Sequence, residues 1–252
     1  MKNLKFSLLA LSLISVGSAA ITVSGNGSGP GSQGWTTTVT NSGNGSQNGV
    51  FGGADPNGNG GGNSSVVASN GWGLYANSNQ VATASYATGD LTGAGGFPAF
   101  IQLGLDNGSF IFGDGLPGSG VVGIQFFDGA TLAYEFRYVG GNTLGGSGRW
   151  VYGDSSGFNQ TSTVMFSTNG YNFRLNQTGT NTYAFSVNGT QITTGTLAGG
   201  AGYVDSVRVF NNNAGSGNTA NVVFNTLVYQ VPEPSAALLG GLGLLAILRR
   251  RR

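Results

Sequence analysis

Apolar and polar residues alternate with a period of two along much of the chain between residues 97 and 229. The alternation is clearest over residues 163–194, where polar residues separate Tyr171, Phe173 and Leu175. Side chains two apart in a strand share a face, so this period predicts strands with one buried and one polar face. No 3.6-residue apolar period occurs here, and we therefore expect no helix in this region.

Short turn signals separate the apolar runs. Asn169-Gly170 and Asn188-Gly189 divide the alternating stretch. Asn-Gly favours a type I′ turn, which needs positive φ at both central residues, and so indicates hairpins. About a dozen short strands of this kind predict an all-β domain, either a sandwich or a barrel. The other expected strands are 97–105, 108–112, 121–127, 131–139, 203–210 and 220–229.

The strand pattern is similar to that of the concanavalin A-like jelly roll, found in lectins, laminin-G-type modules and some glucanases. The similarity rests on the meander over residues 171–192, the strand at 204–210 and the closing strand at 222–227. It implies an antiparallel β-sandwich over residues 64–230, preceded by a Gly/Asn/Ser-rich part of the body at 21–63. A right-handed β-helix is the alternative, but the turns do not recur at a fixed period of roughly 20–25 residues.

Composition supports a folded chain and excludes some chemistry. The chain has 48 glycines and 8% charged residues, but 39% hydrophobic and 11% aromatic residues, which a disordered chain would lack. It has no cysteine and no histidine. Disulfides, the Ser-His-Asp triad and His-ligated metals are therefore excluded.

The first 20 residues have the three parts of a secretory signal peptide. Lys2 and Lys5 form a positive start, residues 6–16 are apolar, and residues 18–20 are small. We predict that the export translocon receives this segment and that signal peptidase cuts after Ala20. An uncleaved anchor is the alternative, against which the short apolar region argues.

The region between the two ends is acidic. The whole chain has a formal charge of +1, but its two lysines lie in the predicted signal peptide and four of its arginines end the chain. The remaining four arginines and eight carboxylates give −4. Such a body lacks the basic patch that nucleic-acid binding requires.

The C-terminal segment, residues 231–252, has three parts. They are a rigid motif, an apolar run and a basic end, namely Pro232, Glu233 and Pro234, then residues 235–248, then Arg249, Arg250, Arg251 and Arg252. As a helix the apolar run is about 21 Å long, short for a hydrocarbon core of about 30 Å. The arginines would stay on the cytoplasmic side of the membrane.

This segment resembles the PEP-CTERM sorting signal. In that family a membrane-embedded exosortase recognises the tail and cuts near the motif, and the carriers are exported proteins of Gram-negative bacteria linked to extracellular polysaccharide and biofilm matrix. The resemblance implies transient anchoring in the inner membrane by a short transmembrane helix, then display at the cell surface or release. An ordinary tail anchor is the alternative, but the span is short for one.

Two local motifs match known sites only in part. Residues 153–157 fit the G-x-S-x-G pattern of a nucleophile elbow, but no histidine or following helix supports it, and we expect a turn. Asp55, Asn57 and Asn59 begin like a calcium loop, but position twelve is Val66 instead of glutamate. We predict no cofactor, with structural calcium as an alternative at this loop.

The body contains one glutamate, which weakens the case for a glycosidase. Glycoside hydrolysis needs two carboxylates, and the glucanases of this fold use a Glu-x-Asp-x-x-Glu cluster. Glu135 is followed by Arg137 and Tyr138, so the pattern fails. We expect Glu135 and Arg137 to form an ion pair on a solvated strand face, and we predict no enzyme activity.

Three tryptophans are candidates for stacking on sugar rings: Trp35, Trp72 and Trp150. The alternative is that they lie in the core. The sequence thus supports an exported structural protein of the cell surface or extracellular matrix, with a lectin-like carbohydrate-binding module as the alternative and a glycoside hydrolase as the remote one. The expected partners are the export and processing enzymes and extracellular polysaccharide.

Overall fold

A computed structural model describes residues 20–40, 48–54, 70–89, 99–107, 120–140, 148–167, 169–215 and 220–230. The predicted signal peptide up to residue 19, the sorting segment 231–252 and the expected strand 108–112 lie outside these ranges. Among the described residues, no helix has the length and apolar character needed to cross a membrane.

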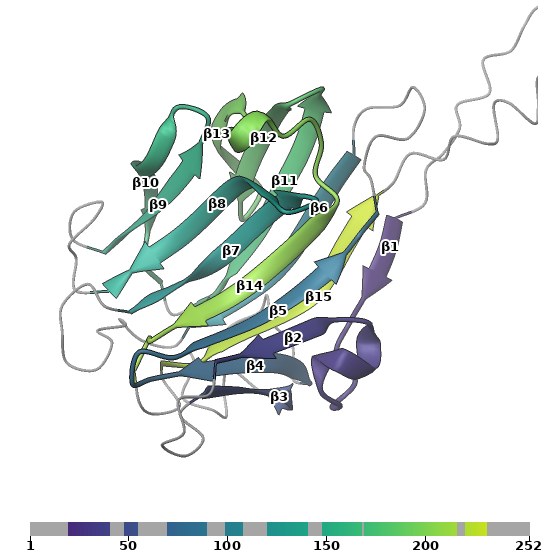
Figure 1. Cartoon of the computed structure of the whole chain (residues 1–252), viewed down its shortest axis with the longest axis vertical. Helices are drawn as coiled ribbons and strands as arrows, with labels where there is room; N and C mark the ends of the chain where they lie inside the picture. Colours follow the sequence, from purple (N-terminus) through teal and green to yellow (C-terminus); the bar gives the residue numbers. More distant parts are fainter. Residues whose placement is uncertain are drawn as a thin grey trace, which may run out of the picture.

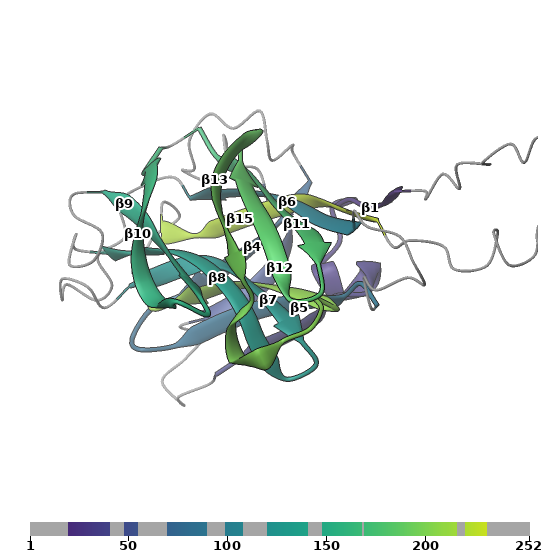
Figure 2. The ribbon, with the colours of Figure 1, turned by 90° about the horizontal axis from the view of Figure 1, so that it is seen from above.

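The described chain forms two antiparallel sheets that pack into a sandwich (Figures 1 and 2), as the sequence predicted. Sheet A has the order β13 (Thr190–Thr196), β12 (Thr182–Val187), β11 (Tyr171–Gly179), β6 (Ala99–Asn107), β15 (Val222–Gln230), β4 (Gly71–Ala76) and β3 (Asn48–Ala54), and β1 (Ala20–Val23) also pairs with β15. Sheet B has the order β10 (Gly157–Met165), β9 (Arg149–Asp154), β8 (Thr131–Val139), β7 (Val121–Asp128), β14 (Ser206–Asn212), β5 (Val81–Ala87) and β2 (Thr36–Val39). The described residues also include two short 3-10 turns, η1 (Pro30–Gln33) and η4 (Ala198–Gly200).

The core lies between the sheets and is rich in aromatic rings. The apolar positions of the alternating strands point inward, and Phe136 stacks on Trp150 with ring centroids 5.2 Å apart. At the other end of the sandwich, Trp35 packs against Trp72 and Phe224. Phe136 and Trp150 of sheet B also pack against Phe173 of sheet A, which links the two sheets. Aromatic pairs contribute about 0.5–1.5 kcal/mol each beyond their burial.

The Asn-Gly dipeptides have two different roles. Val187 pairs with Thr190, so Asn188 and Gly189 form a two-residue turn, and their φ angles of 51° and 80° fit the predicted type I′ hairpin. Asn169-Gly170 does not close a hairpin, because β10 belongs to sheet B and β11 to sheet A. Asn169-Gly170 instead lies in the connection between the two sheets. The rings of β11 that follow it, such as Phe173, pack into the core from sheet A.

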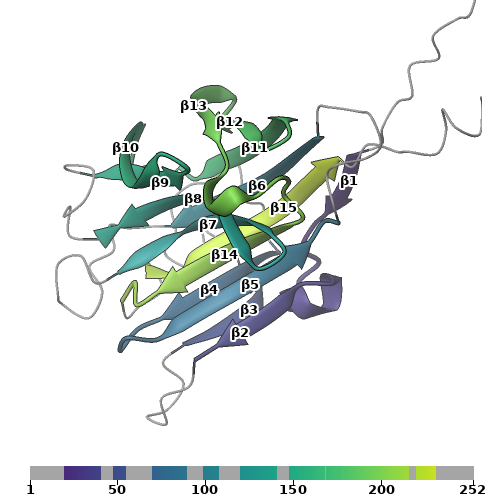
Figure 3. The ribbon, with the colours of Figure 1, turned by 45° about the horizontal axis from the view of Figure 1, so that its top comes forward.

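The Gly/Asn/Ser-rich region 21–63 contributes strands to both sheets. In its described part, β3 extends sheet A and β2 extends sheet B, both at the same end of the sandwich (Figure 3). The described residues of this region therefore belong to the sandwich and form strands at its edges.

The two ends of the described chain lie side by side. In β1 and β15, Ala20 pairs with Gln230 and Val23 with Leu227 (Figure 1). Ala20 is the residue after which signal-peptide cleavage is predicted, and Gln230 precedes the predicted sorting segment. The sandwich therefore brings its two predicted processing points to one corner.

Candidate functional site

Several predicted site residues lie outside the described residues, and the structure leaves them as predictions. They are the sorting motif Pro232, Glu233 and Pro234, the basic end Arg249, Arg250, Arg251 and Arg252, and the calcium candidates Asp55, Asn57 and Asn59. Within the described part of the chain, no three His, Cys, Asp or Glu residues gather in a way that could hold a metal ion.

The tryptophans predicted to stack on sugars are buried. Trp35 has 3% of its surface exposed, and Trp72 and Trp150 have none. Each packs among the core rings because its large apolar area is most stable away from water. The sugar-stacking prediction for these three residues is therefore wrong, and a binding face must be sought among the outward positions of the strands.

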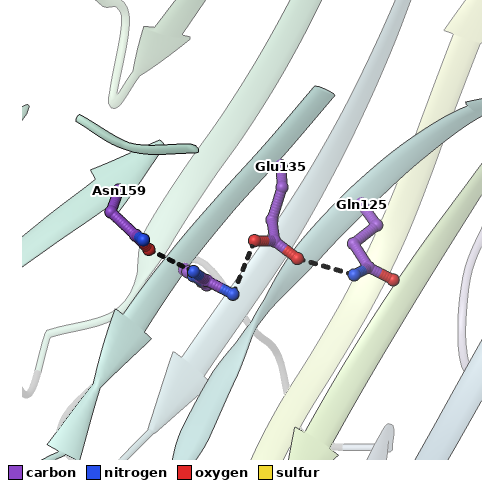
Figure 4. A network of polar contacts seen from close by, with 4 residues as sticks. Gln125, Glu135 and Asn159 are labelled. Atoms are coloured by element: carbon purple, nitrogen blue, oxygen red, sulfur yellow. Dashed lines mark hydrogen bonds and ion pairs between the residues drawn. The ribbon is translucent and has the colours of Figure 1, made fainter. Parts of the chain in front are cut away.

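The outer face of sheet B carries a chain of polar contacts across three strands (Figure 4). Glu135 on β8 forms an ion pair with Arg137, with 2.9 Å between Oε1 and Nη1. The Nε2 of Gln125 on β7 donates to Glu135 Oε2 at 2.6 Å, and Arg137 donates to Asn159 on β10. The predicted same-face ion pair is confirmed.

This network is more buried than the sequence indicated. Glu135 is 4% exposed, so the prediction of a solvated strand face is wrong. Gly153 on β9 lies beside Glu135 in the sheet. The Phe158 ring fits over Gly153 only because glycine has no side chain, since a Cβ at position 153 would lie 2.1 Å from that ring. Phe158 itself is half exposed. With both carboxylate oxygens of Glu135 engaged, the network is suited to holding the strands together.

Other described carboxylates also hold structure. Asp154 follows Gly153 in β9 and so points to the opposite face of sheet B from Glu135, where it accepts from the hydroxyl of Tyr183 and the amide of Gln160. It closes the β9–β10 turn that matched the G-x-S-x-G pattern, and the prediction that this motif is a turn is confirmed.

Asp128 and Asp205 line one open pocket of about 360 Å³ at the end of β7. Asp205 accepts from the backbone N–H of Gly129, and Asp128 accepts from that of Gly202. Asp205 thus fixes the loop that follows Asp128, and Asp128 fixes the loop that precedes Asp205. Because one oxygen of each holds a backbone amide, the pair stabilises two adjacent loops.

The outer face of sheet A contains a second and different polar region. A groove of about 350 Å³ crosses β6, β11 and β12, and we call it the sheet A groove. Its lining consists of amides, one hydroxyl, one guanidinium and a turn glycine, namely Gln102, Asn172, Asn176, Ser186, Arg174 and Gly189. The strand register places Arg174 between Gln102 on one side and Ser186 on the other.

The polar groups of the sheet A groove are largely unused by the protein. Arg174 Nε donates to Asn176 Oδ1 at 2.8 Å, while its guanidinium lies over the Phe100 ring at 3.8 Å. Asn172 Oδ1 is buried and has no partner among the described residues. No described residue forms an ion pair with Arg174. The groove therefore presents donors and acceptors to an external ligand.

Asp106 occupies the same outer face but lies away from the groove. It is four residues from Gln102 along β6, which is about 13 Å in a strand. Its side chain is fully buried, and no described side chain donates to it. Burial raises the pKa of Asp106 to about 6, and the backbone N–H of Asn107 offsets only part of this effect.

Sequence reasoning did not single out the sheet A groove. Asn172, Arg174 and Asn176 were visible as the polar positions that alternate with the core rings. Their place beside Gln102 and Ser186 depends on which strands become neighbours, and β6 lies some 70 residues before β11 in the sequence. The available signal was a run of amides with one arginine on a single strand face.

The comparisons with known proteins agree with this architecture. A conserved carbohydrate esterase from the Shiga toxin-encoding bacteriophage phi24B matches with a TM-score of 0.53 and 12% identity, over 81% of this chain and 92% of that one. A sialidase matches with a TM-score of 0.45 and 7% identity, over 67% of this chain. A galectin from Caenorhabditis elegans matches with a TM-score of 0.32 and 9% identity, over 57% of this chain and 88% of the galectin.

The similarity to the esterase shows the fold alone, and the matches to the sialidase and the galectin, with TM-scores under 0.5, carry no argument. The chain spans 16% of the length of the sialidase, and identity to all three structures is low. No curated protein sequence matches the chain. The expected β-sandwich of jelly-roll type is confirmed, and the chemistry must be argued from the residues of this chain.

One family model matches at the C-terminus. Residues 230–252 match the PEP-CTERM protein-sorting motif, which includes the Pro-Glu-Pro segment, the apolar run and the arginines. The match begins at Gln230, the last residue of β15, so the sorting signal follows the sandwich directly. The chain is thus an antiparallel β-sandwich protein that carries a PEP-CTERM sorting motif, which implies export and processing by an exosortase.

Proposed function

We propose that this protein is a non-catalytic component of the cell surface or extracellular matrix, and that it holds extracellular polysaccharide in the sheet A groove. The observation that carries the proposal is a groove of amide, hydroxyl and guanidinium groups, most of whose hydrogen-bonding capacity is unused, on a sandwich with an export signal. Sugar hydroxyls are both donors and acceptors, and side-chain amides match them because they too have both functions.

The position of the chain ends supports the sorting part of the proposal. Because Ala20 pairs with Gln230, the predicted signal-peptide junction and the start of the sorting motif lie at one corner of the sandwich. A body attached to the membrane at one corner keeps the outer faces of both sheets on the exported side of the membrane. The groove on β6, β11 and β12 would then face material outside the cell.

The arrangement of acidic groups supports a non-catalytic role. A glycosidase needs an acid and a base or nucleophile on either side of one bond. Glu135 and Asp154 lie on opposite faces of sheet B, and Asp106 is on the outer face of sheet A. Asp128 and Asp205 each hold a backbone amide. None of these five described carboxylates lines the sheet A groove.

The sorting part is tested by replacing Pro232, Glu233 and Pro234 with alanine. We expect the variant to stay in the inner membrane with its arginine tail, because the processing enzyme loses the rigid motif it grips. Mass spectrometry and membrane fractionation report the mature size and location. An unchanged size and location would disprove the sorting role.

The binding part is tested on a glycan array with the full chain purified in detergent. We expect Gln102→Ala and Ser186→Ala to weaken binding of the glycans that the parent protein retains. Thr83→Ala, on the outer face of sheet B, is the matched control and should have no effect. Binding that survives both groove substitutions would remove the groove from the proposal.

A further inference from the structure

Arg174 differs from the other three arginines of the body in its surroundings. Arg137 is neutralised by Glu135, and the guanidinium of Arg149 faces the carbonyl oxygen of Ser162. Arg208 lies over an aromatic ring on the outer face of sheet B and donates to a serine hydroxyl. Arg174 presents its charge to a groove with no carboxylate in its lining.

The guanidinium of Arg174 is held ready for a ligand. Phe100 supports its flat face at 3.8 Å, and Asn176 fixes Nε at 2.8 Å. These two contacts fix the plane of the group and leave both terminal nitrogens without a partner among the described residues. A planar fork of two N–H donors matches the two oxygens of a carboxylate, and a fixed fork loses little entropy when it binds.

The neighbours of Arg174 are suited to the rest of a sugar ring. Gln102 lies directly across from it on β6, and Ser186 lies across on β12. The unpartnered Asn172 Oδ1 is two residues away on the same face of β11. Adjacent strands are about 4.8 Å apart, so Gln102 and Ser186 flank Arg174 closely on either side.

We propose that the sheet A groove binds an acidic saccharide, with the carboxylate of a uronic acid on Arg174 and the sugar hydroxyls on Gln102 and Ser186. This inference rests on the proposed function and adds the chemical class of the polysaccharide. A single arginine on a body of formal charge −4 would not retain a polyanion by general attraction, so binding depends on this local fork. A sulfate ester could offer the same anionic chemistry, and the experiment separates the two.

The test measures binding of the full chain in detergent to three immobilised polysaccharides. They are polygalacturonate, the same polymer with its carboxyl groups reduced to alcohols, and a sulfated neutral polymer. We expect at least tenfold tighter binding to polygalacturonate than to the reduced polymer, since only the former offers a carboxylate. Binding to the sulfated polymer should be no tighter than to the reduced one.

Three variants locate the effect. Arg174→Gln should remove the preference for polygalacturonate, so that the variant binds polygalacturonate and the reduced polymer with similar affinity. Gln102→Glu places a carboxylate opposite Arg174, which should occupy the guanidinium and give the same loss without removing the arginine. Arg208→Gln is the matched control, because Arg208 also stacks on a phenylalanine but lies on the other sheet. Circular dichroism of each variant confirms folding.

The outcomes separate the two proposals. Equal binding to polygalacturonate and its reduced form overturns the acidic class but leaves saccharide binding in place. Preference for the sulfated polymer, or a preference that persists in Arg174→Gln, also overturns the inference. Absence of binding to all three polymers by the parent chain overturns both this inference and the polysaccharide-binding function.

Discussion

The outer faces of the two sheets carry similar residues in different arrangements. On sheet B, Glu135 and Arg137 are two residues apart on one strand and form an ion pair that Gln125 completes. On sheet A, Asp106 and Arg174 also lie on one face, but the register puts an amide, Gln102, opposite the arginine. One face satisfies its charges internally, whereas the other leaves a carboxylate and a guanidinium without charged partners among the described residues.

Strand register therefore decides what a charged side chain on an outer sheet face does. Opposite charges two apart in a strand meet because they share a face at close spacing. On sheet A the separation is about 13 Å, too far for an ion pair. The paired charges of sheet B contribute to stability, and the separated charges of sheet A are open to titration or to a ligand. Substitutions of charged residues should therefore lower the free energy of unfolding on sheet B and, for Asp106, raise it on sheet A.

The largest effect is expected from Arg137→Gln. The change leaves the buried carboxylate of Glu135 without its cation, and it should lower the free energy of unfolding by about 2–3 kcal/mol. The figure lies below that for a fully buried pair because the Arg137 side chain is 24% exposed. Urea unfolding followed by fluorescence measures the change. Polysaccharide binding should be unaffected.

A double-mutant cycle sharpens this test. Glu135→Gln alone should lower the free energy of unfolding by about 1–2 kcal/mol. The glutamine amide keeps the shape of the glutamate side chain but loses a charge-assisted hydrogen bond. The double variant should cost less than the sum of the two single variants, because each removes the same interaction. Additive costs would show that the ion pair contributes nothing and that the contrast with sheet A is unfounded.

The opposite sign is expected for Asp106→Asn. The pKa of Asp106 is about 6 in the folded chain and 3.8 in the unfolded one, so the folded state binds the proton more tightly. Stability from this group is therefore full below pH 4 and is lost as the pH rises through 6. Asparagine cannot ionise, and the variant should be more stable by about 1–2 kcal/mol at pH 8. This figure is lower than the pKa shift alone implies, because the buried amide of asparagine would also lack hydrogen-bond partners.

Unfolding curves at pH 4 and pH 8 check this prediction. The parent protein and Asp106→Asn should have nearly equal stability at pH 4 and should diverge above pH 6. The control is Thr83→Ala on the outer face of sheet B, whose effect on stability should not differ between pH 4 and pH 8 because threonine does not titrate. A variant that destabilises at pH 8 would mean that the Asp106 carboxylate is well paired after all.

The smallest effect on stability is expected from Arg174→Gln. Loss of the contact with Phe100 and of the bond to Asn176 should cost less than about 1 kcal/mol. Thermal unfolding in the absence of polysaccharide measures it. A cost as large as that of Arg137→Gln would make Arg174 a structural residue and remove the basis for a ligand at the groove.

Sequence reasoning predicted the class of fold because the period-two pattern depends only on neighbours in the chain. It also identified the strands near 121–127, 131–139 and 220–229 and the Asn188-Gly189 hairpin. It misjudged Asn169-Gly170, because a turn dipeptide does not indicate whether the next strand returns to the same sheet. The strands at 71–76, 81–87 and 149–154 were not predicted either.

The candidate site was less predictable than the fold. The three tryptophans were known as either core or sugar-stacking residues, and only packing decided that they are core. The pairing of Glu135 with Arg137 followed from their spacing, but its burial did not, since that depends on Gln125 and Phe158 from other strands. The sheet A groove unites residues from three strands and could not be read from any one of them.

The sequence by itself determined the sorting motif, the β character of the body and the absence of histidine and cysteine chemistry. These properties depend on residue type and on spacing of a few positions. The tertiary structure alone decided which strands are neighbours and in what register. That arrangement is fixed by the packing of aromatic rings between two sheets, and it leaves Arg174 facing a groove while Arg137 faces a carboxylate.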